Sequence, residues 1–261
     1  MAKQCHEIDY RILGDDMQAV VVTLDPAEQV IAEAGGMLYM EDGIDMQTSM
    51  STDKDKGFFG NFFKAAGRMV MGESFFITTF SNSAGVRADV AFAAPYPGKI
   101  IPLHMDQLGQ EMICQKDAFL CAAQGSQISI AFQKKIGAGL FGGEGFILQR
   151  IQGDGLAFVH AGGTVFEMVL QPGQTLRVDT GCLVAFQPSV NYDIQFVGGF
   201  KNALFGGEGL FFALLTGPGK VYLQTLPFAR LADRIVAASR HMGGQRRGEG
   251  SVLGGLFMGD N

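Results

Sequence analysis

Histidine and cysteine are the residue types of this chain that could most directly support catalysis or metal binding. A metal site in a double-stranded β-helix typically needs an HxH pair with a glutamate and a distant histidine, but no two of the four histidines lie within two residues of each other. His104 and His160 each follow a short apolar run, which favours isolated histidines at strand ends. Cys5 and His6 are adjacent near the terminus, and an incidental pair is the simpler interpretation. We therefore expect neither a metal site nor a cofactor.

The sequence also lacks the local signatures of nucleophilic and phosphate chemistry. It contains no GxSxG turn, and its glycine-rich motifs lack the GK[ST] of a phosphate-binding loop. The four cysteines, Cys5, Cys114, Cys121 and Cys182, form no CxxC pair, which predicts reduced and mostly buried thiols. These observations favour a protein that is not an enzyme.

Three glutamates recur in a glycine-rich motif. Glu144 and Glu208 each lie within an LFGGEG sequence, and Glu73 lies in the similar GESFF. The structural interpretation is that the glycines allow a positive φ or a close strand approach, while the glutamate begins the next strand. The functional interpretation is an acidic ring, in which three equivalent carboxylates face a common axis and hold a cation or a basic partner. The sequence leaves both interpretations open.

A segment rich in phenylalanine could contact a membrane. Residues 57–68 read GFFGNFFKAAGR and place Phe58, Phe59, Phe62 and Phe63 beside two basic residues. Phenylalanine with lysine or arginine on an amphipathic turn can rest in a membrane interface. We favour the alternative that this segment is an insertion whose aromatic side chains cover a sheet edge. Peripheral membrane contact is the less favoured expectation.

The elements that must position these residues repeat along the chain. The LFGGEG sequences begin at residues 140 and 204, which are 64 residues apart. The segments QISIAF at 127–132 and NYDIQF at 191–196 have the same separation. Both alternate apolar with mostly polar residues, which is typical of a half-buried β-strand. Two copies of one unit are therefore predicted, and the glutamate motif near residue 73 indicates a third copy before them.

Short strands with frequent Gly and Pro turns predict an all-β sandwich or barrel. After the third copy, Phe228, Leu231, Ala232 and Ile235 follow helical spacing, and Pro227 suits a first helical position. The predicted organisation is a first β repeat at 1–95 with an insertion near 51–61, a second at 96–163, a third at 164–227, a C-terminal helix at 228–242 and a flexible Gly-rich tail at 243–261.

Composition and charge narrow the class of protein. Hydrophobic residues make up 47% and charged residues 18% of the 261 residues, which excludes disorder for most of the chain. The sequence shows neither a signal peptide nor an apolar run long enough to span a membrane, so we expect a cytoplasmic protein. The net charge is −6, with 20 basic against 26 acidic residues, which argues against nucleic-acid binding.

The repeated motif (L/M)-x-G-G-E-(G/S)-(F/L), after a basic and apolar stretch, resembles the AIM mitochondrial-biogenesis family (altered inheritance of mitochondria) in its bacterial branch. The resemblance covers about residues 7–227. It implies a fold like the tryptophan RNA-binding attenuation protein (TRAP), with three similar TRAP-like β-sandwich repeats, double-stranded β-helix-like, about a pseudo-threefold axis. The resemblance brings no catalytic residues, and it does not bring RNA or tryptophan binding, because fold does not carry function.

The function expected from these observations is a non-enzymatic scaffold or protein-interaction protein. Such a protein would act on an unidentified protein partner, and unpaired sheet edges would favour a homo-oligomer. The alternative is a small-ligand or cation-binding protein, with a site at the pseudo-threefold axis formed by Glu73, Glu144 and Glu208.

We predict no sequence-specific affinity for RNA or DNA at physiological salt. Binding would need a cluster of Lys and Arg to neutralise phosphates. The sequence instead has separate short basic pairs: Lys54 with Lys56, Lys134-Lys135, and Arg246-Arg247 beside Glu249 in the Gly-rich tail. A mobility-shift titration should show at most weak binding. Submicromolar affinity with a steep salt dependence would contradict the prediction.

Overall fold

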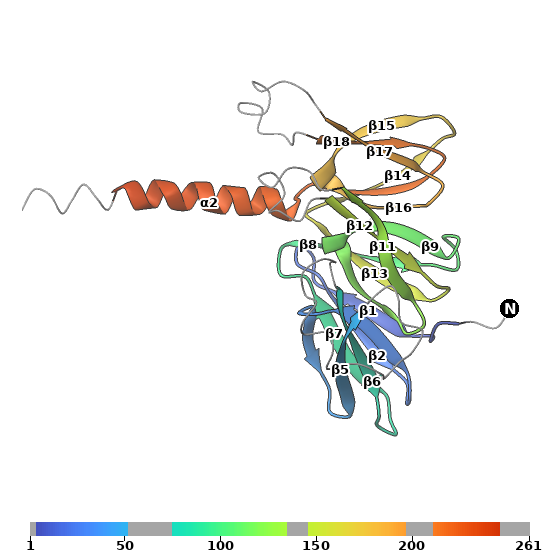
Figure 1. Ribbon diagram of the computed structural model, residues 1–261. Coiled ribbons are helices and arrows are strands. Elements are labelled where there is room, and N and C mark those ends of the chain that lie inside the picture. The colour runs from blue at the N-terminus through green and yellow to red at the C-terminus, as the bar shows by residue number, and fades with distance from the viewer. Residues whose placement is uncertain (1–3, 52–74, 135–145, 197–210, 246–261) are drawn as a thin grey trace, which may run out of the picture.

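The computed structural model describes residues 4–51, 75–134, 146–196 and 211–245, and these form antiparallel sheets with one C-terminal α-helix (Figure 1). Strand β1 (Asp9–Leu13) precedes three sets of six strands. The first set contains β2 (Ala19–Leu24), β3 (Gln29–Glu33), β4 (Met37–Met40), β5 (Ile44–Ser51), β6 (Phe75–Asn82) and β7 (Ala88–Ala93). The second set contains β8 (Gly98–His104), β9 (Glu111–Gln115), β10 (Phe119–Ala123), β11 (Gln127–Lys134), β12 (Phe146–Gln152) and β13 (Leu156–Gly162). The third set contains β14 (Val165–Leu170), β15 (Thr175–Asp179), β16 (Leu183–Phe186), β17 (Asn191–Phe196), β18 (Phe211–Thr216) and β19 (Gly219–Gln224).

The strands of each set pair in the same scheme. In the first set β7 lies between β2 and β4, and β6 lies between β3 and β5. In the second set β13 lies between β8 and β10, and β12 lies between β9 and β11. In the third set β19 lies between β14 and β16, and β18 lies between β15 and β17. The predicted strands at 127–132 and 191–196 are β11 and β17, which hold the same place in their sets.

Neighbouring sets are joined by shared sheets. Strand β3 of the first set pairs with β10 of the second, and β9 of the second pairs with β16 of the third. These two joins create six-stranded sheets in the orders β5-β6-β3-β10-β13-β8 and β11-β12-β9-β16-β19-β14. The outer sheets, β1-β2-β7-β4 and β15-β18-β17, are smaller because their edge strands β4 and β15 have no such join.

The three sets therefore follow one another in a row. The first set lies at one end of the molecule and β15, β17 and β18 lie at the other (Figure 1). Within the described residues, strands β4 and β15 do not pair with each other. The fold is all-β with one C-terminal helix, as predicted, but the pseudo-threefold arrangement is not confirmed, because nothing in the described sheets closes the first set onto the third.

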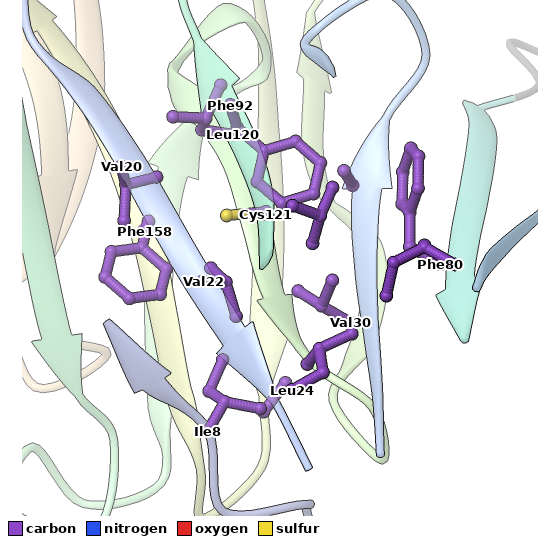
Figure 2. Close-up of a cluster of buried hydrophobic side chains, with 14 of the residues drawn as sticks. Ile8, Val20, Val22, Leu24, Val30, Phe80, Phe92, Leu120, Cys121 and Phe158 are labelled. Carbon is purple, nitrogen blue, oxygen red and sulfur yellow. The ribbon is translucent and has the colours of Figure 1, made fainter. Parts of the chain in front are cut away.

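Three clusters of buried apolar side chains fill the space between the sheets. The first cluster combines residues of the first set with Leu120, Cys121 and Phe158 of the second (Figure 2). The second cluster combines residues of the second set with Val184 and others of the third. Each join therefore includes both main-chain hydrogen bonds and a shared core, and burial of apolar surface is the main stabilising term.

Helix α2 (Phe228–Gln245) follows the last strand and projects away from the sheets (Figure 1). It begins directly after Pro227, where the missing N–H of proline costs nothing. Its first turn is attached to the third set, because Arg230 donates to the Asp179 carboxylate at 2.9 Å. The helix continues through Gly243 and Gly244 beyond its predicted end at residue 242, and the tail after Gln245 lies outside the described residues.

We predict that Phe158→Ala lowers the free energy of unfolding by about 3–5 kcal/mol, because this side chain is completely buried in the core shared by the first and second sets. Denaturant titration would measure the loss. The control is Phe166→Ala on β14, where the side chain is 54% exposed and we expect a change below about 1 kcal/mol. Equal effects of the two substitutions would contradict a shared core.

Candidate interaction surface

The glutamates and phenylalanines singled out in the sequence lie outside the described residues. This holds for the proposed acidic ring of Glu73, Glu144 and Glu208 and for the aromatic segment with Phe58, Phe59, Phe62 and Phe63. The acidic ring and the membrane contact both stay predictions.

The described histidines have separate surroundings. His160 on β13 is buried, and its ring lies 4.5 Å from that of Tyr96 in an edge-to-face contact. Burial lowers the pKa of His160 to about 4, although a hydrogen bond with the Tyr96 main chain opposes this, so the imidazole is neutral at pH 7. His6 accepts a hydrogen bond from the Gln29 main-chain N–H and so ties the N-terminal segment to β3. Within the described ranges, no three His, Cys, Asp or Glu side chains gather as a metal site would require.

The cysteines are free thiols, as the sequence predicted. Cys5, Cys114 and Cys121 are buried and Cys182 is partly exposed. Burial raises the pKa of the Cys114 and Cys121 thiols well above the usual value, which makes them poor nucleophiles at neutral pH. We therefore attribute these cysteines to packing in the core rather than to chemical reactivity.

A partly buried carboxyl group lies beside the first join. Glu33 ends β3, and burial, together with the nearby charge of Asp117, raises its pKa to about 7. Asp117 belongs to the short 3-10 turn that leads into β10, so both groups sit where the first and second sets meet. Lys116 in the same turn acts in the opposite direction but is the weaker influence.

Strand β4 carries the most unusual surface of the described chain. Its four residues are Met37, Leu38, Tyr39 and Met40, and these are 38%, 59%, 39% and 39% exposed. Among the described strands their outer main-chain edge has no partner, since β4 ends its sheet. Sequence reasoning missed this site because an apolar run of four residues between turns normally indicates a buried strand.

The strands that hold the same place as β4 are buried throughout. All residues of β10 and β16 are buried, and each of these strands is covered by a strand of the preceding set. The three strands share one irregularity, a register shift after the first residue, at Met37, Phe119 and Leu183 respectively. Strand β4 thus has the shape and composition of an interior strand but lacks a neighbour on one side.

Polar contacts hold β4 in place from its other side. The Glu41 carboxylate, directly after β4, accepts a hydrogen bond from the Asp89 main-chain N–H of β7 at 2.8 Å. The Asp89 carboxylate accepts from Thr23 on β2 and from Arg11 on β1, both at 2.6 Å. Burial tends to raise the pKa of Asp89, but these two hydrogen bonds outweigh it and lower the pKa. The strand is therefore presented by a fixed four-stranded sheet.

Two further surfaces are open. In the part of the chain that the structure describes, strand β15 pairs with β18 alone, and its outward residues Thr175 and Arg177 are exposed. On helix α2, the exposed apolar side chains are Phe228, Ile235 and Val236, at 51%, 60% and 47%. The helix was predicted to be amphipathic, and most of its apolar face has no cover from the described sheets.

These features define an antiparallel β protein of linked strand sets with open edges at both ends. The chain belongs to the family described as Mitochondrial biogenesis AIM24, whose family model matches residues 10–226. This confirms the family that the repeated glycine–glutamate motif predicted.

Two relatives come from Streptococcus pyogenes. An uncharacterized protein of serotype M6 is 29% identical over 218 residues, which is 83% of this chain and 84% of the relative. A crystal structure of a protein from the same species superposes with a TM-score of 0.70 at 24% identity and covers 89% of this chain and 100% of its own. That likeness shows the fold alone, and the expected likeness to the attenuation protein stays a prediction.

In the described part of the chain, no helix combines the length and the apolar character needed to cross a bilayer. The cytoplasmic location stays a prediction.

We predict that Glu33→Gln raises the free energy of unfolding relative to wild type more at pH 8 than at pH 5. The folded-state pKa of about 7 lies above the unfolded value, so the stability that protonated Glu33 contributes is present below about pH 4.5 and is lost as the pH rises through 7. Glutamine stays neutral, and the variant should gain about 1–3 kcal/mol over the wild type between pH 5 and pH 8.

Chemical denaturation at the two pH values would measure this gain. The control is Phe166→Ala on the exposed side of β14, which alters no ionisable group and should keep the pH dependence of the wild type. Neutral, buried His160 also stabilises the fold, and this contribution is lost as the pH falls below about 6.5 toward 4. Because His160 is present in both the wild type and the variant, its effect cancels in the comparison. A pH-independent difference between Glu33→Gln and wild type would contradict the prediction.

Proposed function

We propose that this protein is a non-enzymatic scaffold that binds other protein chains through the open edge of β4. The observation that carries the proposal is the row of four exposed apolar side chains on a strand whose outer edge pairs with no described strand. An exposed sheet edge offers main-chain N–H and C=O groups to an extended partner, and apolar side chains along it add burial energy.

The residue types of β4 favour a binding role over protection of the sheet edge against pairing. Proteins that keep a sheet edge free use a very short edge strand, charged side chains, especially lysine, or proline. Strand β4 reads MLYM and contains neither charge nor proline, and Glu41 after it is engaged with β7. Such an edge would promote aggregation unless another chain covers it, and this supports a specific partner at β4.

Helix α2 is the second candidate contact surface. Phe228 at its start packs its ring 5.3 Å from that of Tyr96, whereas Ile235 and Val236 further along are exposed. An amphipathic helix that leaves its apolar face free is suited to lie in a groove of another protein.

We further propose that the three strand sets are copies of one duplicated unit of the TRAP-like type. The shared pairing scheme and the shared register shift at the start of β4, β10 and β16 support this proposal. A chain that repeats one framework, with the described histidines His6, His104 and His160 in separate surroundings, is better suited to assembly than to catalysis.

The test is affinity capture from a cell lysate with wild type and the variant Leu38→Lys. A lysine on the edge should weaken binding of any partner that covers β4, and retained partner should fall by at least about tenfold. Val86→Lys is the matched control, because Val86 is 69% exposed on a turn away from β4. Equal capture by wild type and Leu38→Lys would contradict a partner site at this edge.

A further inference from the structure

We infer that β4 of one copy of this chain pairs with β15 of a second copy, so that copies join head to tail. The inference rests on the proposed function, since it names the partner of the β4 edge. Its basis is that the chain already contains this join twice, between β3 and β10 and between β9 and β16.

Strand β15 holds in the third set the place that β3 and β9 hold in the others. Strands β3, β9 and β15 pair with β6, β12 and β18, respectively. The equivalent residues in these three pairings are Ala32 in β3, Cys114 in β9 and Val178 in β15. Strand β4 likewise holds the place of β10 and β16. The molecule therefore presents β4, one strand of such a join, at one end and β15, the other strand, at the opposite end.

The two halves cannot meet within one chain. Strand β15 and the sheet that contains β4 lie at opposite ends of the molecule (Figure 1), and the sets are fixed in a row by their shared sheets. A second copy can supply the missing half without any change in the fold of either chain. Such a contact is heterologous, so it closes into a ring or continues as an open chain.

The internal joins define the register of the proposed one. Ala32 lies opposite Cys121, and Cys114 lies opposite Ala185. The common register shift fixes which residue of β4 corresponds to Cys121 in β10 and to Ala185 in β16. That residue is Tyr39. In the join between copies, Tyr39 therefore lies opposite Val178.

The proposed join also explains which side chains are exposed. Leu120, next to Cys121, is 4% exposed because it enters the core of the first set, and Val184 is 0% exposed because it enters the core of the second. Leu38 holds the same position in β4 and is 59% exposed. The head-to-tail join would place Leu38 against the core of the third set in the neighbouring copy.

The third set shows the complementary gap. Val178 is 7% exposed, whereas its counterparts Ala32 and Cys114 are 0% exposed. Leu176 is only half-buried, whereas the residues at the same step of β3 and β9 are buried completely. The outer side of β15 is thus less covered than β3 and β9, as expected for a strand that lacks its neighbour.

Disulfide trapping between two separately purified variants tests the register. Both carry Cys182→Ser, which removes the partly exposed native thiol; one adds Tyr39→Cys and the other Val178→Cys. Under mild oxidation the mixture should form a disulfide-linked pair of chains, because residues directly opposite in antiparallel strands are close enough to bridge. Neither variant alone should do so. Thr175→Cys in place of Val178→Cys is the register control and should give little product, since it lies about 10 Å along the strand.

A second measurement uses the natural sequence. Light scattering of wild type should give a mass of at least two chains, and Leu38→Lys should shift the mass toward a single 28.0 kDa chain while Val86→Lys leaves it unchanged. Cross-linking of Tyr39→Cys to itself, or equal product with Thr175→Cys, would overturn the inference, as would a monomeric wild type at high concentration. If self-association fails while capture of a lysate protein still depends on Leu38, the scaffold proposal stands and only this inference is rejected.

Discussion

The main-chain hydrogen bonds of an edge strand need a partner, and the architecture of this protein follows from how that need is met. Each strand set is completed by a strand of the next, through β10 for the first set and β16 for the second. The same strands carry apolar side chains into the neighbouring core, so a join is both a ladder of hydrogen bonds and a packed interface. A single set would leave both needs unmet.

This dependence explains why ionisable groups near the joins are unusual. Glu33 is drawn out of water where the first two sets meet, and its pKa rises to about 7. At the same step of the third set stands Asp179, which has the Arg230 guanidinium and the Gly181 main-chain N–H as partners. The third set has no following set within the described chain, and Arg230 at the start of α2 pairs with this carboxylate. The same position in the fold is thus partly buried by a neighbouring set in one case and paired with a helix arginine in the other.

Membership in the AIM24 family places this architecture beside a relative described as uncharacterized, and the crystal structure from Streptococcus pyogenes shares its fold. A fold by itself does not carry a function. What distinguishes the surface of this chain is the contrast between β4 and its buried counterparts, because the same strand position is interior twice and exposed once. The functional argument therefore depends on that difference within one molecule.

Local patterns were enough for the sequence to determine the β class, the strands at 127–132 and 191–196, the C-terminal helix from Phe228 and the family. Alternation, turn residues and helical spacing act between residues close in the chain, so they can be recognised without a structure. The glutamate motif was equally visible, but its three carboxylates lie outside the described residues. Whether the run Met37–Met40 is buried could not be predicted, because burial of a strand depends on which strand lies beside it. Strands β10 and β16 have that neighbour and β4 does not, and only the tertiary structure decided this, since it arranges the three sets in a row with two joins and two open ends.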